Sequence, residues 1–251
     1  MSARLDPRPV SPAVILAAVA EGWRQMRGCL RPAAGFAAVF VLIGVLIFFL
    51  LWRFGLGQMI VPFAGGFLLV GPAVLSGFIA LRRAAGEGRP PEMARIAEGF
   101  RRAPRGLWVV AAVCALLFLI WISDAATVFS FMIGVDSLPD AARVLRFHAF
   151  TGVMGAVLAG IVFCISAFSV PLLYDRRAHL VEAVTASVRA VFANLPAMLL
   201  WGLVLAGAVI SSVLCPPLLM LSLPCLAFAS DLIYLEIFPP NEGLPDTSPL
   251  I

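Results

Sequence analysis

Six long apolar stretches alternate with short polar segments along this chain of 251 residues. The apolar stretches cover residues 33–51, 60–81, 107–123, 149–173, 195–214 and 218–237. The hydrocarbon layer of a bilayer is about 30 Å thick, and about 20 apolar helical residues are needed to cross it. The pattern therefore predicts an all-α, polytopic membrane protein with a bundle of six transmembrane helices.

The overall composition agrees with this class. The chain is 62% hydrophobic and 13% charged, whereas soluble domains carry about 45–50% apolar and about 25% charged residues. A soluble helical bundle is therefore excluded as an interpretation. All 18 basic residues are arginines that lie outside the apolar centres, so the net charge of +4 reflects loop composition and we expect no binding of nucleic acid.

The arginines also predict the orientation in the membrane. They concentrate in the N-terminal region and in the loops after the second and fourth spans, and only Arg53, Arg143 and Arg146 lie on the opposite side. Cytoplasmic loops carry the excess of basic residues, so both termini are expected in the cytoplasm. Residues 12–238 would form one transmembrane domain, between a disordered N-terminal tail (1–11) and a flexible C-terminal tail (239–251).

The last two spans have two interpretations, because Pro216 and Pro217 interrupt one continuous apolar stretch. Two prolines remove two backbone donors and end a helix. Two full crossings joined by this hinge are one interpretation. A re-entrant pair of helices is the other, since irregular backbone at membrane depth needs protein or water around it.

Three short segments that precede the first, third and fifth spans resemble one another. Residues 14–27, 92–102 and 181–192 predict amphipathic helices at the membrane interface. Their similar parts read Glu21-Gly22-Trp23-Arg24, Glu98-Gly99-Phe100-Arg101 and Ala186-Ser187-Val188-Arg189. One interpretation is a threefold parallel repeat of interfacial helix, span and span. The other is that ordinary interface preferences place Arg and aromatic residues before any span.

Small residues mark faces on which helices can approach closely. The second span carries Gly66, Gly71, Pro72 and Gly77, and Pro72 is expected to kink it. The fourth span carries Gly152, Ala156 and Gly160, four residues apart. Such faces serve packing within a chain or between two copies of it, and both interpretations stay open.

Ionisable residues within apolar spans indicate functional sites, because burying a charge in hydrocarbon is costly. Asp231 is the deepest of them, and a structural interpretation has it bonded to Ser230, Tyr234 or a nearby arginine. The candidate functional or partner-contact residues are Asp231, Asp175, Arg176, Arg177, Arg82, Arg83 and Trp23. The two histidines fall on opposite sides of the membrane, and nucleotide, hydrolase and metalloprotease motifs are missing. We expect no enzyme activity, no metal and no cofactor.

Three blocks of sequence resemble the DUF2189 family of predicted bacterial integral membrane proteins. The first is Gly65-Gly-Phe-Leu-Leu-Val-Gly-Pro-Ala-Val-Leu-Ser-Gly-Phe, followed by Leu81-Arg-Arg-Ala-Ala-Gly-Glu-Gly. The others are Phe168-Ser-Val-Pro-Leu-Leu-Tyr-Asp-Arg-Arg and Ala186-Ser-Val-Arg-Ala-Val-Phe-Ala-Asn-Leu-Pro-Ala-Met. The resemblance implies a multi-pass protein of the bacterial inner membrane with six spans, and it implies no reaction.

These features predict a non-enzymatic scaffold, accessory subunit or assembly factor for membrane components. Its expected partners are anionic lipid headgroups at the cytoplasmic face, together with another membrane protein or a second copy of the chain. The alternative is a transporter or permease component for a lipid-like or small neutral solute. No charged residue at mid-span lines a route through the bundle, which weighs against a proton-coupled carrier.

Overall fold

The computed structural model describes residues 5–134 and 140–240, apart from the side chains of residues 66–70, 72 and 73. Every regular element in these ranges is a helix, which confirms the all-α class. The long helices are α2 (Leu30–Arg53), α3 (Ile60–Gly86), α5 (Arg105–Met132), α6 (Ala141–Ser166), α9 (Leu195–Leu214) and α10 (Leu219–Ile237). The shorter ones are α1 (Pro12–Gly28), α4 (Met93–Arg102), α7 (Ser169–Tyr174), α8 (Leu180–Ala193), η1 (Gly57–Met59) and η2 (Pro216–Leu218).

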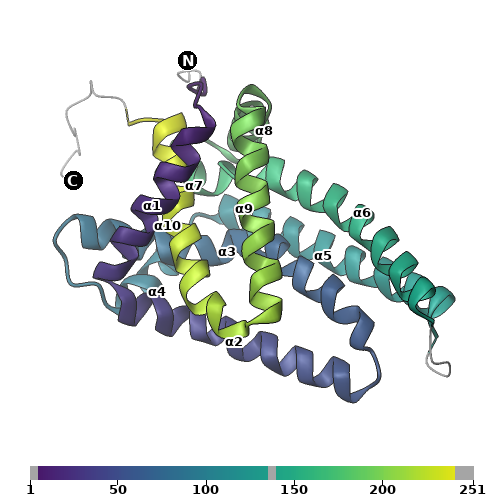
Figure 1. Cartoon of the computed structure of the whole chain (residues 1–251). Helices are drawn as coiled ribbons and strands as arrows, with labels where there is room; N and C mark the ends of the chain where they lie inside the picture. The colour runs from purple at the N-terminus through teal and green to yellow at the C-terminus, as the bar shows by residue number, and fades with distance from the viewer. Residues whose placement is uncertain (1–4, 135–139, 241–251) are drawn as a thin grey trace.

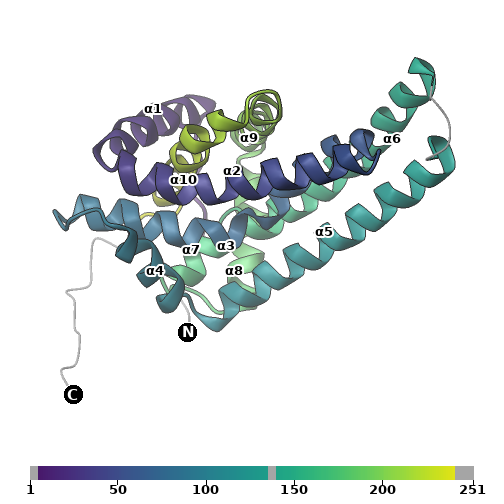
Figure 2. The same cartoon turned by 90° about the horizontal axis from the view of Figure 1, so that it is seen from below.

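The long helices form three hairpins that fan out from one end of the molecule (Figure 1). The first hairpin is α2 with α3, the second is α5 with α6, and the third is α9 with α10. In Figure 2, α9 is seen almost end-on whereas α2 and α5 are seen along their length. The third hairpin therefore crosses the other two at a steep angle, and all three meet where α1, α4, α7 and α8 gather.

Five helical segments within the described residues are long and apolar enough to cross a membrane: Leu30–Arg53, Arg105–Met132, Ala141–Tyr174, Leu195–Leu214 and Pro216–Ile237. Large hydrophobic side chains cover their outer faces, for example Leu42, Leu116 and Leu203. Such a surface would be unstable in water and suits contact with lipid. The chain is a multi-pass integral membrane protein; the predicted second span corresponds to α3, which is not among the five segments.

Two predicted spans have different bounds in the structure. The third, predicted over 107–123, extends to Met132 in α5 and leaves Asp124 exposed inside the helix. The fourth, predicted over 149–173, is broken between α6 and α7 at Ala167 and Phe168. Pro171 explains this break, because it has no N–H to donate to the Ala167 carbonyl and its ring crowds that group.

The short helices α1, α4 and α8 coincide with the three predicted amphipathic segments. In α1 and α4 a glycine permits close contact with a long helix. A Cβ atom on Gly22 would lie 2.8 Å from the Cys225 carbonyl oxygen, and one on Gly99 would lie 2.6 Å from the Ser76 carbonyl oxygen. Any larger side chain at either position would push the two helices apart.

In α8 the corresponding residue is a serine that is completely buried. The hydroxyl of Ser187 donates to the Cys164 carbonyl at 2.8 Å and accepts from the Phe168 N–H at 3.1 Å. It thereby bonds to backbone groups exposed by the break between α6 and α7. The contact holds α8 against the end of the second hairpin.

The buried face of α1 differs from the one that helical spacing predicts. Ile15, Val19, Trp23 and Met26 fall on one face at helical spacing, but the buried residues are Ile15, Ala18, Gly22 and Met26. Trp23 is 41% exposed. Its neighbour Gly22 takes the inner position because only glycine fits against α10 there.

The small residues of α6 at Gly152, Ala156 and Gly160 do not contact other helices in the described part of the chain. No atom lies within 4 Å of a Cβ built on Gly152 or Gly160, and Ala156 is exposed. The helix instead packs through Gly155, where a Cβ would lie 2.9 Å from the ring of Trp121. Gly155 is thus the glycine of α6 that faces the neighbouring α5.

The small residues of α3 have different surroundings. Gly77 lies against Ile96 and Phe100 of α4, whereas no atom lies within 4 Å of a Cβ on Gly71. Gly66 and Pro72 belong to α3, and their side chains lie outside the described residues. Close helix packing is therefore found at Gly77, near the end where the hairpins meet.

The described part of the N-terminal tail is bound to the helices, which corrects the expectation of disorder there. The Arg8 N–H donates to the Ile237 carbonyl at 3.0 Å, and the Val10 N–H donates to Asn194 Oδ1 at 2.6 Å. These bonds tie the tail to the end of α10 and the start of α9. Residues 1–4 and 241–251 of the predicted tails lie outside the described residues.

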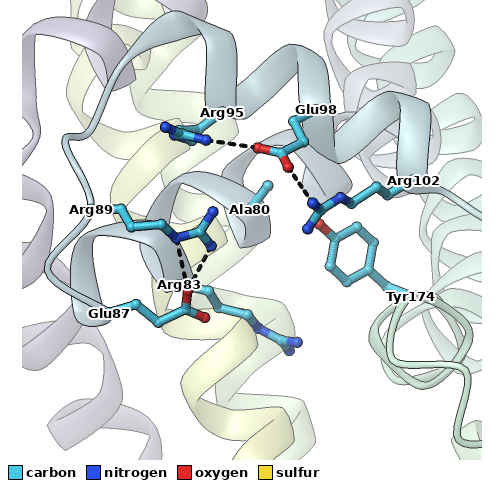
Figure 3. A pocket seen from close by; sticks show the side chains of 8 residues that line it. All are labelled: Ala80, Arg83, Glu87, Arg89, Arg95, Glu98, Arg102 and Tyr174. Carbon is cyan, nitrogen blue, oxygen red and sulfur yellow. Dashed lines mark hydrogen bonds and ion pairs between the residues drawn. The ribbon is translucent and has the colours of Figure 1, made fainter. Parts of the chain in front are cut away.

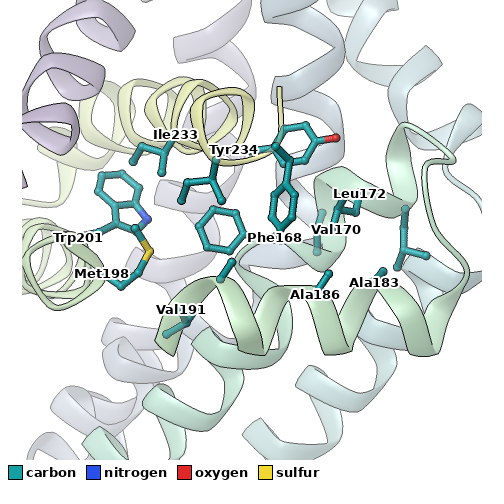
Figure 4. Packing of buried hydrophobic residues seen from close by; sticks show 14 of the residues in the cluster. Phe168, Val170, Leu172, Ala183, Ala186, Val191, Met198, Trp201, Ile233 and Tyr234 are labelled. Atoms are coloured by element: carbon teal, nitrogen blue, oxygen red, sulfur yellow. The ribbon is translucent and has the colours of Figure 1, made fainter. Parts of the chain in front are cut away.

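Buried hydrophobic side chains fix α7 among α8, α9 and α10 (Figure 4). Phe168 is 2% exposed and lies in the same buried cluster as Trp201 of α9 and Val191 of α8. Tyr234 of α10 is completely buried in the same cluster. This packing sets the position of α7 relative to α10. Both helices carry polar side chains where they approach each other.

Candidate functional site

Asp231 lies on α10 and is completely buried. Its carboxylate accepts hydrogen bonds from two adjacent arginines in the last turns of α3. Arg82 donates through Nε at 2.7 Å, and Arg83 donates through Nη2 at 2.8 Å. Arg82 bonds to Oδ2, and Arg83 bonds to Oδ1 through Nη2 and to Oδ2 through Nε at 3.2 Å. Both carboxylate oxygens of Asp231 are therefore engaged by α3.

Arg83 extends this arrangement to the end of α7. Its Nη1 donates to Asp175 Oδ1, and its Nη2 lies 3.3 Å from Asp175 Oδ2. The guanidinium also lies over the ring of Tyr174, 5.7 Å from the ring centroid. One arginine thus bridges carboxylates from the second and third hairpins.

Tyr234 and Arg177 complete the group. The Tyr234 hydroxyl donates to Asp175 Oδ2 at 2.8 Å and accepts from Arg177 Nη1 at 3.2 Å. Arg177 also donates to the carbonyls of Phe238 and Pro239, at 2.6 and 3.0 Å, and so binds the end of α10. We refer to Arg82, Arg83, Asp175, Arg177, Asp231 and Tyr234 as the arginine–aspartate cluster.

Local structure brings these side chains into reach of one another. Asp231 and Tyr234 are three residues apart on α10, a spacing that places them on one side of the helix. Arg176 adopts a positive φ of 54° directly after α7, which turns the chain between Asp175 and Arg177. Gln25 of α1 lies 3.5 Å from Arg82 through its side-chain oxygen, so a fourth segment approaches the cluster.

The charges of the cluster nearly balance. Three guanidinium groups face two carboxylates, and the carboxylate oxygens are occupied by donors from the protein itself. An ionised group away from water is stable only when it is paired and hydrogen-bonded, and this condition is met for Asp231. The arrangement is suited to holding helices together, since each carboxylate oxygen of Asp175 and Asp231 accepts at least one hydrogen bond from the protein.

A small pocket with several arginines opens beside the cluster (Figure 3). Its volume is about 190 Å³, and we call it the arginine pocket. Glu98 of α4 lies between two of the arginines, 3.1 Å from Arg95 Nη1 and 2.5 Å from Arg102 Nη2. The hydrogen bond from Arg95 is the main cause that lowers the pKa of Glu98, so this carboxyl is ionised at neutral pH. The lining residues are Ala80, Arg83, Glu87, Arg89, Arg95, Glu98, Arg102 and Tyr174.

Most of the candidate residues proposed from the sequence come together in the structure. Asp231, Asp175, Arg82, Arg83 and Arg177 all belong to the cluster. Trp23 stands apart on α1. Arg176 lines a second pocket of about 600 Å³ at the start of α8. Of the three structural partners considered for Asp231, the arginine is the one found.

Two features were missed from the sequence. Tyr234 was considered only as a partner of Asp231, whereas it bonds to Asp175 and Arg177. The arginine pocket was not foreseen, although Arg95, Glu98 and Arg102 follow the i, i+3 and i+4 spacing of ion pairs on a helix. Within the part of the chain that the structure describes, no group of three His, Cys, Asp or Glu residues is placed to hold a metal ion.

Comparison with known proteins identifies one family. Residues 60–175 match the family described as "Predicted integral membrane protein (DUF2189)". The matched segment begins with α3 and ends at Asp175, so it contains Arg82, Arg83 and Asp175 but not Asp231 or Tyr234. No curated protein and no solved structure matches the chain.

Proposed function

We propose that this chain, of which residues 60–175 match the DUF2189 family of predicted integral membrane proteins, is a non-enzymatic scaffold, accessory subunit or assembly factor of the bacterial inner membrane. The arginine–aspartate cluster is the observation that carries the proposal. It joins the ends of all three hairpins, and its donors and acceptors bond to one another. A protein that holds partners in place needs such a fixed centre.

The burial of the cluster supports a structural role over a catalytic one. A catalytic acid or base has to reach the proton that it transfers, but Asp231 is completely buried and faces Arg82 and Arg83. Replacing a buried ion pair by apolar residues is often neutral or stabilising. A role in specifying one arrangement of helices therefore accounts for retaining charges there.

The proposal includes six spans, with α3 as the second, and cytoplasmic termini. α3 has 27 residues, or about 40 Å at 1.5 Å per residue, which exceeds the roughly 30 Å needed. The steep crossing of the hairpins requires tilt, and α5 with 28 residues is long enough to span while tilted. The arginine-rich end, where all hairpins meet, is assigned to the cytoplasm by the positive-inside rule.

A threefold repeat is part of the same proposal, supported by similar contacts in each unit. In each case a small residue of the short helix contacts the carbonyl group of one residue in a neighbouring hairpin. The same small residue also contacts the residue four positions later in the sequence. The contacts are Gly22 on Cys225 and Ala229, Gly99 on Ser76 and Ala80, and Ser187 on Cys164 and Phe168. Thus α4 packs on the first hairpin, α8 on the second and α1 on the third, which closes a ring.

Crosslinking in cells followed by affinity purification in mild detergent tests the scaffold role. We expect one membrane protein to co-purify at constant stoichiometry, and an Asp231→Ala variant to lose it because the hairpins separate. Asp124→Asn on the exposed face of α5 is the matched control and should keep the partner. Recovery of the wild-type chain only as a lone monomer contradicts the proposal.

A transporter or permease component for a lipid-like or small neutral solute is the second candidate. The break between α6 and α7 favours it, since interrupted helices line many transport sites. The second pocket, about 600 Å³, lies between the end of α7 and the start of α8 and has the size of small-molecule sites, roughly 300–1,000 Å³. Flux measured in proteoliposomes separates the two candidates: Pro171→Ala should change a transport rate and should leave scaffold binding unaltered.

A further inference from the structure

We propose that the arginine pocket between α3, α4 and α7 binds an anionic phosphate, either in the headgroup of an anionic lipid or as free inorganic phosphate. The proposal goes beyond the scaffold function and does not depend on it. It rests on the charge of the lining residues, on an unpaired donor, on the pocket's size and on an exposed tryptophan at the start of the next helix.

The lining of the pocket has excess positive charge. Four arginines and two glutamates line it, and Arg83 already faces Asp175 and Asp231 of the cluster. The remaining three arginines face only Glu87 and Glu98. One positive charge is left without a carboxylate, which matches the single charge of a phosphodiester.

The donors are also not used up. Arg95 Nε is buried and has no hydrogen-bond partner, and a buried donor without a partner is costly. Glu98 occupies one Nη atom each of Arg95 and Arg102, while Arg102 is 66% exposed and able to turn toward a ligand. A guanidinium offers five N–H groups in a planar fork that suits two phosphate oxygens at once. Figure 3 shows these side chains arranged around the pocket from α4 and the preceding loop.

The size and the surroundings favour a headgroup-sized ligand. A volume of about 190 Å³ is below the range of roughly 300–1,000 Å³ for drug-sized ligands. Outside the pocket lining, the ring of Phe100 on α4 lies 6.4 Å from that of Trp108 in the first turn of α5, and Trp108 is 46% exposed. Exposed Trp residues are enriched at the level of lipid headgroups, and basic pockets at the cytoplasmic ends of helices bind anionic headgroups.

The test uses the full chain in detergent and native mass spectrometry of bound lipid. The protein is equilibrated with mixed micelles of phosphatidylglycerol and phosphatidylcholine, and separately with inorganic phosphate. For the wild-type protein we expect retention of one anionic ligand. The double variant Arg95→Gln/Arg102→Gln should bind it about 25-fold more weakly, from about fivefold for each guanidinium.

Two further variants keep the result interpretable. Arg24→Gln is the matched control, because Arg24 is 73% exposed and pairs with Glu21 on the equivalent helix α1; binding should change less than about twofold. Glu98→Gln removes the carboxylate that competes for Arg95 and Arg102, so it should tighten binding. A misfolded protein would not bind more tightly. The increased affinity expected for Glu98→Gln therefore distinguishes loss of the binding site from loss of the fold, even where the double variant folds poorly.

The two arms of the experiment also distinguish the source of the phosphate. Retention of phosphatidylglycerol without binding of inorganic phosphate identifies a lipid headgroup. Binding of inorganic phosphate with the same dependence on Arg95 and Arg102 identifies a soluble anion. Equal binding of phosphatidylcholine and phosphatidylglycerol without phosphate binding, an equal loss in Arg24→Gln, or weaker binding in Glu98→Gln overturns the proposal.

Discussion

Arg82 and Asp231 are 149 residues apart in the chain and form a hydrogen-bonded ion pair through Arg82 Nε at 2.7 Å. The aspartate is completely buried, and the arginine side chain is 11% exposed. Through this pair the end of α3 is joined to α10, so the first and third hairpins are held at one point. Arg83 and Asp175 extend the connection to the second hairpin.

Replacing Asp231 with alanine should strongly destabilise the protein. The change leaves Arg82 without its carboxylate, and removing one partner of a buried pair costs about 3–5 kcal/mol. In detergent this corresponds to a fall of roughly 10 °C in the thermal midpoint. Gel filtration after heating measures it, with Asp124→Asn as the exposed control. An unchanged midpoint in Asp231→Ala would show that the cluster does not stabilise the fold.

Exchanging the charges should restore part of the lost stability. Arg82→Asp and Asp231→Arg each place like charges together, but the double variant recreates an opposite pair at the same contact. We expect a coupling free energy of about 1–3 kcal/mol from the double-mutant cycle. The recovery should be incomplete because Arg83 also bonds to Asp231. Additive effects of the two substitutions would contradict a direct interaction.

Enlarging the contact glycines should separate the short helices from the long ones. Gly22→Ala and Gly99→Ala each bring a methyl group within 3 Å of a carbonyl oxygen, on α10 and α3 respectively. Overpacking of this kind costs about 1–3 kcal/mol. Gly35→Ala on α2 has no atom within 4 Å of the new Cβ and should be neutral or stabilising. Equal thermal midpoints in all three variants would rule out these contacts as determinants of packing.

Labelling of Cys215 tests whether the third hairpin crosses the membrane. This cysteine is exposed at the tip of the hairpin, between α9 and η2. In a variant that keeps only Cys215, a membrane-impermeant maleimide should label intact spheroplasts from the outside. Arg24→Cys in a cysteine-free background is the control and should react only after lysis. Labelling of Cys215 only after lysis would favour a re-entrant pair.

Much of the fold follows from local sequence properties. Runs of about 20 apolar residues and the pattern of the interfacial segments predicted α2, α9, α10 and the short helices α1, α4 and α8 within a few residues. Proline effects are also local. The predicted fourth span nevertheless ran through the break before Pro171, because the apolar composition continues through this proline.

The candidate site was only partly predictable. The cost of burying a charge singled out Asp231 from the sequence, and its pairing with an arginine was among the expected interpretations. Its particular partners Arg82 and Arg83, the hydroxyl of Tyr234 and the arginine pocket depend on which helix ends meet. The same holds for α6. The spacing of Gly152 and Gly160 shows that small residues share one face of the helix, but it does not show which neighbour covers that face.

The sequence alone therefore determined the membrane class, the helical segments and the side that carries the arginines, because transfer free energies and helical periodicity act over neighbouring residues. The tertiary structure alone decided that α3, α7 and α10 converge, that Gly22 and Gly99 face their long helices, and that an open pocket remains between α3 and α4. Those relationships join residues far apart in the chain, and only the packing of whole helices brings them within hydrogen-bonding distance.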